Sequence, residues 1–441
     1  MARHRKSGAY ALDGTDVSLL SRRGPIVRIL IFGINFFPEM VGVGQYTTSL
    51  SESLSRDGDE VLVVSGQPYF PVWKIFDGHP RFAWAREKLR SAVTVIRCPH
   101  YVPRSPTGAR RILHHASFAF AALPIMLWTA LRWRPDVVFV VAPGLVSAPM
   151  GLMAARLSGA KSWLHVQDFE VEAAFATGLL SETSFLGSGA VAFENWIHKR
   201  FDRVSSISEA MVRRLEAKGL PPERIVELRN WADLKAVVPL DGVSPMRAKL
   251  GITTPNVALY SGTIGNKQGL EIVPEAARRL AHRDDLTFVI CGDGPFLPEL
   301  RRMSEGLRNI RFFPLRPMEE LGDLLGMASV HLLPQIAGVA DLVLPSKLTN
   351  MLASGRPVIA TADPDTTLAR ALRGCGETVP PGNADRLVET LERLLDNPKQ
   401  RERWGRAARE RALDQWDSSC ILAGFRDAIH ELCAPAAQPT R

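Results

Sequence analysis

The sequence lacks the features that would place the chain outside a reducing compartment. Its five cysteines are scattered and form no Cys-x-x-Cys pair, which argues against a disulfide framework and against a zinc site. Residues 1–24 are polar and basic without an apolar core, so they predict a disordered tail rather than a secretory signal. Lysines and arginines also outnumber the acidic residues, and the resulting net charge of +8 favours an anionic substrate or an anionic surface. We therefore expect a cytoplasmic protein.

The chain also lacks a complete dinucleotide-binding fingerprint. Gly42 and Gly44 follow the first predicted strand only after the insertion 35–41, and Tyr46 stands where the third glycine would be. The second predicted strand ends without the acidic residue that would bind a nicotinamide ribose. A dinucleotide is therefore disfavoured. The loop through Gln45 can still bring a small acceptor or a phosphate to backbone N–H groups, and a plain packing turn explains it equally well.

Two series of short apolar segments, separated by helical stretches, run along the chain. Near-continuous β-branched runs are typical of parallel strands covered on both faces. The first series lies at 27–34, 60–66, 93–99, 136–143, 162–168 and 203–208, and the second at 256–262, 286–292, 310–315, 330–333 and 357–362. This pattern predicts an α/β fold with two doubly wound, Rossmann-like domains that face a cleft.

The pattern breaks near residues 231–242, where we place the domain boundary. The prediction is an N-terminal domain at 25–233 and a C-terminal domain at 234–405. A helical segment at 406–433 is expected to cross back over the first domain, before a tail at 434–441. Because both sheets would point their strand ends into the cleft, we expect the binding site there.

The segment around Ser346 has the parts needed to hold a diphosphate. After the predicted strand 330–333, Pro345 ends a glycine-containing loop, and Ser346 is a suitable N-cap for a helix through 347–354. Ligands of open parallel sheets bind where strands end, and the N–H groups at a helix start point at an anion. Lys347 adds a positive charge at this helix start, although an ordinary surface lysine is an equally good explanation.

Two further strand ends of the second domain carry glycine loops. They contain Gly262, Thr263, Gly265 and Lys267 after one strand, and Gly292 and Gly294 after the next. One such loop is weak evidence for a ligand. Three strand ends of one sheet that offer glycines, two of them with lysines, together predict a nucleotide diphosphate site.

With these residues in place, the chain resembles glycosyltransferase family 4 enzymes of the GT-B fold. The resemblance rests on segments such as FGINFFPEMVGVGQYT, HVQDFEVEA, YSGTIGNKQGLE and ADLVLPSKLTNMLASG, which occur in order from Arg28 to beyond Gly355. It implies a retaining sugar transfer from a nucleotide diphosphate sugar, with no metal ion and no other cofactor. Through family members that build colanic acid-like exopolysaccharides, it also implies GDP-fucose as the donor and a lipid-linked oligosaccharide on the cytoplasmic face as the acceptor.

The resemblance assigns the donor side to the second domain. Lys267 and Lys347 would hold the diphosphate with catalytic effect, Gly265 and Ser346 would supply N–H groups, and Leu315 would border the base. The remaining assigned donor-binding residues are Gly262, Thr263, Gly292, Gly294, Asp341, Leu348, Thr349 and Asn350.

The chain departs from the family pattern at three of these positions. Many members have a pair of glutamates around the helix at 347–354, where this chain has Asp341 and Asn350. Many also have an arginine where Thr263 stands. Asn350 can still form a hydrogen bond to a ribose hydroxyl.

The acceptor side is expected in the first domain. The acceptor would pass Gly42, Gly44 and Gln45, and Asp168, at the end of the strand in HVQDFE, is expected to orient the acceptor hydroxyl. The alternative for Asp168 is that it only caps the next segment. His165 is predicted to be a satisfied core histidine, and an acceptor-side contact to the sugar is the alternative.

The longest uncharged apolar stretch, at 116–131, is too short to span a bilayer and contains Pro124. Arginines and tryptophans flank it. It predicts either a helix packed on the first sheet or an interfacial helix on the inner leaflet of the plasma membrane, which would make the protein a peripheral membrane enzyme.

Two rival function classes remain. A nucleotide-sugar epimerase on the same fold would need acid and base carboxylates in the cleft, where the chain offers few besides Asp168 and Glu170. A non-enzymatic nucleic-acid or membrane-binding protein is indicated by charge alone. The chain lacks the interleaved aromatic and basic residues of single-strand binders, so we expect no nucleic acid partner. The Asp-x-Asp triplet at 363–365 predicts a plain turn rather than a metal site.

Overall fold

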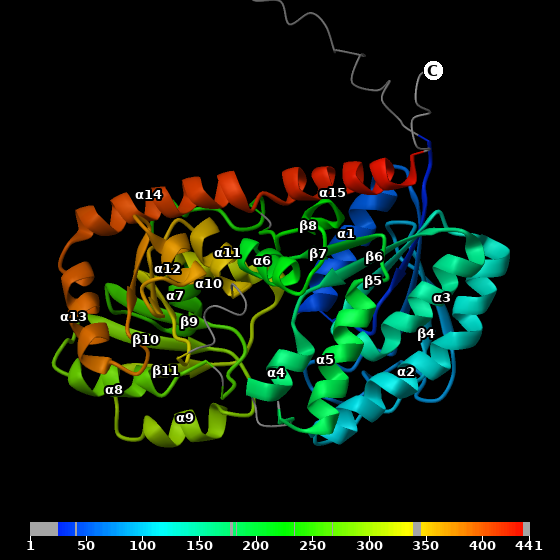
Figure 1. The fold of residues 1–441 in the computed structure, drawn as a ribbon. Helices are drawn as coiled ribbons and strands as arrows, with labels where there is room; N and C mark the ends of the chain where they lie inside the picture. Colours follow the sequence, from blue (N-terminus) through cyan, green and yellow to red (C-terminus); the bar gives the residue numbers. More distant parts are fainter. Residues whose placement is uncertain are drawn as a thin grey trace, which may run out of the picture.

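The structure is a computed structural model that describes residues 25–39, 42–176, 180, 181, 183–232, 234–266, 268–337 and 345–434. It contains two α/β domains that lie side by side, and the last two helices run along one side of both (Figure 1). The predicted tail at 1–24 and most of the tail at 434–441 lie outside the described residues.

The N-terminal domain is built on an eight-stranded sheet with the order β3-β4-β2-β1-β5-β6-β7-β8. Neighbouring strands are parallel except β3, which is antiparallel to β4. The strands are β1 Arg28–Phe32, β2 Glu60–Gly66, β3 Ala85–Lys88, β4 Thr94–Cys98, β5 Val137–Ala142, β6 Lys161–Val166, β7 Arg203–Ser206 and β8 Ile225–Glu227.

The C-terminal domain has a six-stranded, fully parallel sheet with the order β11-β10-β9-β12-β13-β14. Its strands are β9 Asn256–Ser261, β10 Leu286–Cys291, β11 Ile310–Phe313, β12 Val330–Leu333, β13 Val358–Thr361 and β14 Gly376–Val379. Two doubly wound parallel-sheet domains are therefore present, as the apolar runs predicted.

Helices cover both faces of each sheet. In the N-terminal domain they are α1 Val43–Arg56, α2 Gly108–Trp128, α3 Ala148–Ser158, α4 Glu170–Ala176, α5 Phe185–His198 and α6 Glu209–Ala217. In the C-terminal domain they are α7 Pro245–Leu250, α8 Ile272–Arg279, α9 Leu297–Met303, α10 Leu321–Gly326, α11 Lys347–Ala353, α12 Thr367–Leu372, α13 Ala384–Leu395 and α14 Pro398–Gln415. The last helix is α15 Ser418–Cys433.

The alternation of side chains along each strand builds two cores around the first sheet. Leu30 and Leu164 belong to the cluster that includes residues of α2 and α3, whereas Ile31 and Trp163 belong to the cluster that includes residues of α1 and α15. Because both faces are covered, the strands of this sheet read as continuous apolar runs. The carboxyl ends of the strands are left to form the site.

The chain crosses between the domains twice at nearly the same place. The Ala232 N–H donates to the Trp416 carbonyl at 2.9 Å, so the linker and the α14–α15 junction are hydrogen-bonded. Beyond this junction α15 packs Phe425 against the sheet of the N-terminal domain. The buried carboxylate of Asp59 accepts hydrogen bonds from Arg426, at 2.8 Å, and His430. The helical segment expected at 406–433 thus begins within α14. The chain passes from the C-terminal domain to the N-terminal domain at residues 416–417.

The apolar stretch expected at 116–131 lies inside a longer helix. α2 continues into a π-helical turn at Thr129–Trp133, and the resulting 26-residue stretch Gly108–Trp133 is long and apolar enough to cross a membrane by length and composition alone. The argument that it is too short is therefore wrong. However, Phe118, Ala122 and Met126 are fully buried in the core under the sheet, so much of the stretch is a packed helix of this domain.

Candidate functional site

The ammonium of Lys347 lies at the carboxyl edge of the second sheet. The lysine begins α11, and its side chain reaches back to the end of β9, where Nζ donates to the Tyr260 hydroxyl at 2.5 Å and to the Thr263 carbonyl at 3.2 Å. Nζ also lies 4.3 Å from the centre of the Tyr260 ring. Lys347 is therefore held in place by neutral oxygens and an aromatic face.

Gly262 makes room for this lysine. Its φ of +128° is unfavourable for other residues, and a Cβ there would lie 2.6 Å from Lys347 Cε. The aliphatic part of the lysine thus runs across the backbone of the first glycine loop. The structure brings together Gly262, Thr263 and Lys347, which the sequence had placed on separate strand ends.

Burial lowers the pKa of Lys347 to about 7. No carboxylate contributes to this shift, so the cation has no negative partner in the described part of the chain that raises its pKa. A bound diphosphate would supply the missing negative charge. The site is thus suited to an anion at the end of β9.

The second glycine loop packs directly on the first. A Cβ at Gly292 would lie 2.0 Å from the Gly262 carbonyl oxygen, and one at Gly294 would lie 2.2 Å from the Ile264 carbonyl oxygen. The assignment of Gly265 as a phosphate donor needs correction, because its N–H already donates to Gln268 Oε1 at 2.9 Å. That N–H becomes available only if the Gln268 side chain moves.

The start of α11 differs from the sequence prediction. Ser346 occupies the N-cap position before Lys347, as predicted, but it has helical φ and ψ angles and its side chain makes no capping hydrogen bond. Leu348 is fully buried in the core and cannot contact a donor, which corrects its assignment. Thr349 is also buried and donates to the Ser346 carbonyl at 2.9 Å. Asn350 is half-buried.

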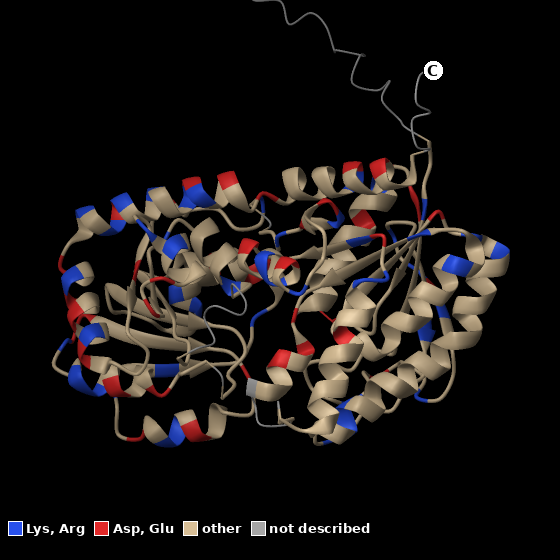
Figure 2. Cartoon of the chain, in the orientation of Figure 1, with Lys and Arg blue, Asp and Glu red and all other residues tan. Residues whose placement is uncertain are grey.

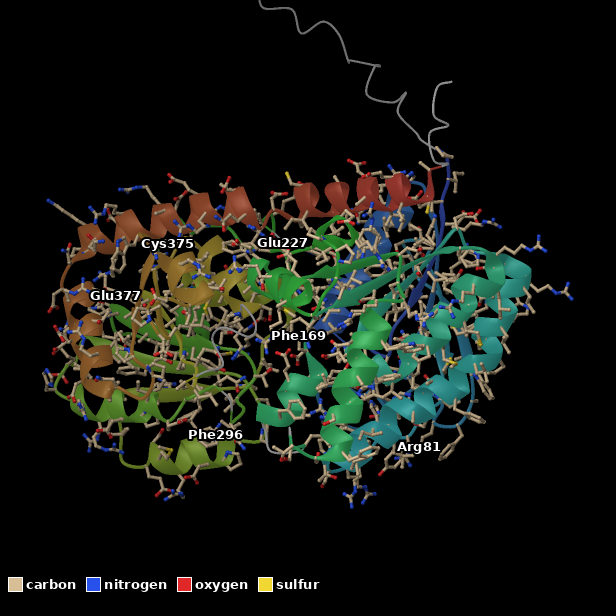
Figure 3. The ribbon with its side chains drawn as sticks, in the orientation of Figure 1. Arg81, Phe169, Glu227, Phe296, Cys375 and Glu377 are labelled. Carbon is tan, nitrogen blue, oxygen red and sulfur yellow. The ribbon has the colours of Figure 1, made fainter. Side chains whose placement is uncertain are left out.

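The base-side residue Leu315 follows β11 and is exposed. Figure 3 shows Phe296, which immediately precedes α9, at the edge of the C-terminal domain.

The N-terminal domain contributes Tyr46 to this site. Although it belongs to α1, its hydroxyl lies close to the side chains of Thr349 and Ser346, which act to lower its pKa. The ring packs edge-on against Trp231 of the linker at 5.2 Å between centroids, and burial raises the pKa of the hydroxyl to about 12. The starts of α1 and α11 therefore lie close together where the two domains meet.

The acceptor-side glycines lie just before Tyr46. Gly42 has a φ of +62°, and a Cβ at Gly44 would lie 2.9 Å from the Glu39 carbonyl oxygen. Gln45 is half-buried in the first turn of α1. Packing alone therefore requires a glycine at position 44. The close contact in this turn does not depend on a bound ligand.

His165 is a satisfied core residue, as the sequence predicted, and this corrects the alternative that it contacts the acceptor. Only 4% of the residue is exposed, its Nδ1 lies 2.9 Å from Ser205 Oγ, and the ring stacks on Phe139. Burial lowers its pKa to about 3, so the imidazole is neutral. Asp168 differs because it is exposed at the end of β6. Figure 3 shows the next residue, Phe169, on the side of the N-terminal domain that faces the C-terminal domain.

Two buried carboxylates near these strand ends fix loops. Glu170 accepts hydrogen bonds from the backbone N–H groups of Gly144 and Leu145, the latter at 2.9 Å. Glu39 accepts from the N–H groups of Tyr69 and Phe70, at 2.7 and 2.9 Å. Burial raises the pKa of both carboxyl groups. In each carboxylate one oxygen accepts both backbone hydrogen bonds, so both side chains hold loops in place instead of forming the acid and base pair that an epimerase needs.

Three residues of the site were not singled out from the sequence. Tyr260 lies near the end of a largely apolar strand. Its hydroxyl was the signal in the sequence that a hydrogen-bond partner lies at this strand end. Tyr46 was noted only because it replaced a glycine, and Glu39 was not considered. Lys267 and Asp341, both assigned to the donor side, lie outside the described residues. In the described ranges there is no group of three or more His, Cys, Asp or Glu side chains that could hold a metal ion.

Two protein families match the chain. Residues 41–231 match the family described as Glycosyl transferase 4-like domain, and residues 244–411 match the family described as Glycosyl transferases group 1. A putative colanic acid biosynthesis glycosyl transferase, WcaI of Escherichia coli K12, is 39% identical, and the match covers 91% of this chain and all of that protein. An alpha-D-kanosaminyltransferase of Streptomyces kanamyceticus is 31% identical over 36% of this chain and 41% of its own length.

Solved structures share the arrangement of the two domains. Sucrose-phosphate synthase from Thermosynechococcus elongatus has a TM-score of 0.69 at 16% identity, with 92% of this chain and 98% of that chain covered. The Anabaena protein Alr3699/HepE in complex with UDP-glucose has a TM-score of 0.66 at 14% identity, with 92% and 100% covered. WaaG, a glycosyltransferase involved in lipopolysaccharide biosynthesis, has a TM-score of 0.64 at 17% identity, with 91% and 99% covered. At such identities the likeness shows the fold.

Proposed function

The chain belongs to the glycosyltransferase family 4 enzymes of the GT-B fold, and from this premise we propose that it transfers L-fucose from GDP-fucose to a lipid-linked oligosaccharide. The reaction would contribute to a colanic acid-like exopolysaccharide. That context is supported by the similarity to the putative colanic acid biosynthesis glycosyl transferase of Escherichia coli along nearly the whole chain. GDP-fucose and the lipid-linked acceptor rest on the family resemblance of the sequence.

The observation that carries the proposal is the position of Lys347. Its ammonium lies beside the end of β9, next to the backbone of Gly262, and no carboxylate of the described residues neutralises it. A parallel sheet of this type binds its ligand at the carboxyl ends of its strands. The diphosphate of a nucleotide sugar fits both the charge and the place.

The chemistry follows from the charge that develops on the leaving diphosphate. As the bond between the sugar C1 and the phosphate oxygen breaks, negative charge grows on the phosphate, and a fixed cation such as Lys347 lowers the barrier. In a retaining transfer the acceptor oxygen attacks C1 on the same face. The acceptor proton then passes to the departing phosphate oxygen, so no separate catalytic base and no metal ion is required.

Asp168 is proposed to orient the acceptor hydroxyl. It lies at the end of β6 and is exposed, next to Phe169 on the side that faces the C-terminal domain. An Asp168→Asn variant should bind the nucleotide normally and transfer sugar more slowly. Unchanged turnover would remove Asp168 from this role.

The first test is the thermal stability of the purified protein with GDP, UDP, ADP and NAD at equal concentration. A ligand at about 100 times its dissociation constant adds about 2.7 kcal/mol to the free energy of unfolding. We expect a shift with GDP that is lost in Lys347→Met and kept in Lys399→Met, an exposed lysine at the start of α14. A shift with UDP or ADP in place of GDP would contradict the fucosyl donor and keep the glycosyltransferase.

The stereochemistry is tested on the product. GDP-fucose and a polyprenyl diphosphate oligosaccharide are incubated with the enzyme, and NMR identifies the configuration at C1 of the transferred sugar. Retention and full activity in the presence of a chelator are expected. Inversion, or loss of activity with the chelator, would contradict the proposed mechanism.

A further inference from the structure

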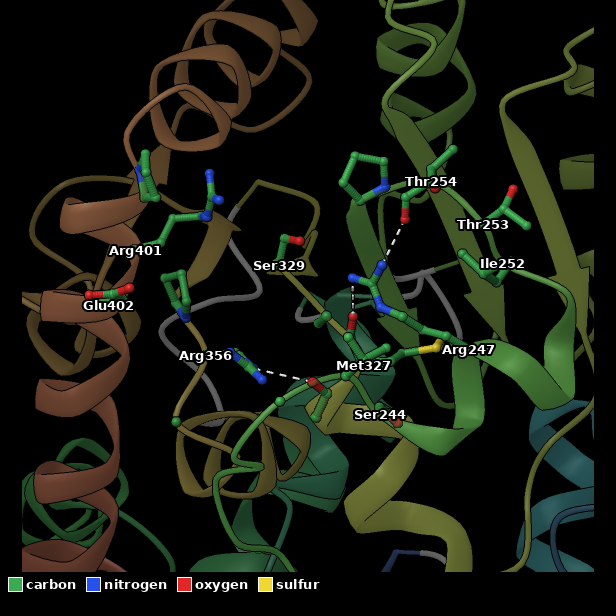
Figure 4. Close-up of a pocket in the computed structure, with 18 of the residues that line it drawn as sticks. Ser244, Arg247, Ile252, Thr253, Thr254, Met327, Ser329, Arg356, Arg401 and Glu402 are labelled. Atoms are coloured by element: carbon green, nitrogen blue, oxygen red, sulfur yellow. Dashed lines mark hydrogen bonds between the residues drawn. The ribbon is translucent and has the colours of Figure 1, made fainter.

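A pocket of about 660 Å³ lies at the edge of the C-terminal sheet that is opposite to the donor site (Figure 4). Its walls come from segments that immediately precede β9, β12 and β13, whereas the glycine loops of the donor site follow β9 and β10. Residues of α7 and the start of α14 complete the lining. The two sites are therefore separated by the length of the strands.

Three arginines from different elements line this pocket. Arg247 belongs to α7, Arg356 follows α11, and Arg401 belongs to the first turn of α14. Figure 4 shows Arg247 and Arg401 on opposite walls, with Arg356 between them. Such guanidinium groups, each with five N–H donors in a planar fork, are well suited to bind a phosphate.

Backbone carbonyls hold each arginine in place. Arg247 donates to the carbonyls of Thr254, at 2.7 Å, and Met327, at 3.0 Å. Arg356 uses its Nε, which donates to the Gly326 carbonyl at 3.2 Å. Within the described ranges, no hydrogen-bond acceptor is found for its Nη1 and Nη2 atoms. Arg401 donates to the carbonyls at the end of α13, including that of Leu394 at 2.8 Å.

The positive charges in this pocket are poorly compensated. The pKa of Arg247 is lowered by burial and by the charge of Arg356, and the pKa of Arg356 is lowered by burial and by the charge of Arg401. Carboxylates act on Arg401 alone, chiefly those of Asp396 and Glu402, and burial still lowers its pKa. Two of the three guanidiniums, those of Arg247 and Arg356, are thus influenced by like charge and by no carboxylate of the described part of the chain.

Another arginine of the same domain, by contrast, has acidic partners. Arg283 forms ion pairs with Asp285, at 2.8 Å, and with Asp396, at 2.9 Å. These carboxylates raise its pKa. Arg401 has the carboxylates of Asp396 and Glu402 nearby, whereas no carboxylate in the described ranges acts on Arg247 or Arg356, so a bound anion would compensate these two.

We propose that this pocket binds a phosphate group, either as a free anion or as part of a small phosphorylated molecule. A phosphate has several oxygens that accept hydrogen bonds, so it can bind Arg356, whose Nη atoms have no acceptor among the described residues, together with a neighbouring guanidinium. The cavity is larger than a single phosphate, and Ile252 and Pro357 in its lining offer apolar contacts to the rest of such a molecule. This site is separate from the donor site at Lys347 and does not depend on the proposed sugar transfer.

Occupation of the pocket would connect three parts of the domain. Arg247 lies on the helix that follows the interdomain linker, Arg356 follows the helix that begins with Lys347, and Arg401 lies on the helix that leads to α15. A ligand held by all three should therefore stabilise the C-terminal domain against unfolding.

The test is isothermal titration calorimetry of the full chain with inorganic phosphate, diphosphate and GDP, in a sulfate-free buffer of low ionic strength. The variant is Arg356→Gln, and the matched control is Arg308→Gln, an exposed arginine of the same domain away from the pocket. We expect Arg356→Gln to weaken phosphate binding about tenfold or more, the effect of losing a charge-assisted hydrogen bond. Arg308→Gln and Lys347→Met should both keep this binding.

Several results would overturn the proposal. They are the absence of phosphate binding by the wild-type protein, equal weakening by Arg308→Gln, and loss of binding in Lys347→Met instead of Arg356→Gln. If Arg356→Gln does not fold, Arg401→Gln takes its place with the same expected outcome. Phosphate and diphosphate that bind with equal strength would indicate a free anion, whereas tighter binding of GDP that Lys347→Met retains would indicate a nucleotide.

Discussion

The positive charge beside Thr263 comes from a different element than the family resemblance implies. Many family members carry an arginine at this position, and here the Thr263 carbonyl accepts a hydrogen bond from Lys347 at 3.2 Å instead. The side chain can cross the loop because Gly262 has no Cβ. The sequence identified both residues but could not show their contact, since 84 residues separate Lys347 from Thr263 along the chain.

Lys347 should make nucleotide binding depend on pH. In the free protein burial lowers its pKa to about 7, and a bound diphosphate would raise it again. Above pH 7 the free protein must therefore take up a proton when it binds GDP, so affinity should fall as the pH rises, by at most about tenfold per pH unit. Calorimetry between about pH 7 and pH 8.5 measures this.

The Lys347→Met variant serves as the comparison for this prediction. It should bind GDP weakly and with little dependence on pH over the same range, whereas Lys399→Met should behave like the wild-type protein. A wild-type affinity that stays constant from pH 7 upwards would show that the charge state of Lys347 does not matter for binding.

Gly262 and Gly292 should respond differently to alanine. At Gly262 the new Cβ would meet the flexible side chain of Lys347, so we expect weaker GDP binding from a displaced lysine together with modest backbone strain. At Gly292 the Cβ would meet the Gly262 carbonyl oxygen at 2.0 Å. Backbone cannot yield easily, so Gly292→Ala should lose about 1–3 kcal/mol of stability.

Urea unfolding and GDP titration of both variants separate the two effects. Gly189→Ala is the control, because a Cβ at this helical glycine meets nothing within 4 Å. It should leave stability unchanged or slightly raised. The prediction is wrong if Gly262→Ala proves to be the more destabilising of the two loop variants.

At the scale of elements, the long buried strands could be predicted from sequence, whereas three of the four edge strands could not. All strands with continuous β-branched runs are present, from β1 to β13. The missed strands are β3, which has a polar sequence and alternating exposure, and the short strands β8 and β14. β3, β8 and β14 lie at sheet edges, where a strand has one neighbour and is covered less, so its sequence need not be apolar.

α2 should bind to anionic membranes through an exposed apolar stripe. Leu113, Phe120 and Trp128 are spaced by seven and eight residues, which places them on one helical face, and Phe120 is 79% exposed. Arg110 and Arg111 lie at the start of the helix, and Figure 2 shows it largely without charge farther along. Such a helix rests on a leaflet through apolar contact and attraction to headgroups.

Sedimentation with vesicles that contain phosphatidylglycerol tests this interpretation. We expect binding at low salt, loss at about 0.5 M salt because of screening, and weaker binding of Phe120→Ser. Leu413→Ser, at an exposed position on α14, should bind like the wild-type protein. Binding that is absent at every salt concentration would remove the membrane role of α2.

At the scale of the whole molecule, the two domains were predictable and their contact was not. The break in the strand pattern near 231–242 separates the sheets, because each domain must bury its own apolar faces. The meeting of Tyr46 with Ser346 and Thr349 depends on how the finished domains dock. No local pattern in the sequence reports on such docking, so this part of the site emerged only from the structure.

Tyr46 should help to hold the cleft closed. Tyr46→Phe keeps the ring packed on Trp231 and removes only the hydroxyl that reaches α11. The free energy of unfolding should fall by about 1 kcal/mol or less, because one neutral hydrogen bond contributes that much. We expect a larger radius of gyration by small-angle X-ray scattering and a lower kcat, since the domains would spend more time apart.

Tyr69→Phe is the matched control for this change. Its hydroxyl forms a hydrogen bond to Asn35 within the N-terminal domain, so its loss should leave the radius of gyration unaltered. A Tyr46→Phe variant with wild-type scattering and wild-type kcat would show that the hydroxyl does not govern closure. In that case the linker and the crossing of α14 into α15 would set the relative position of the domains by themselves.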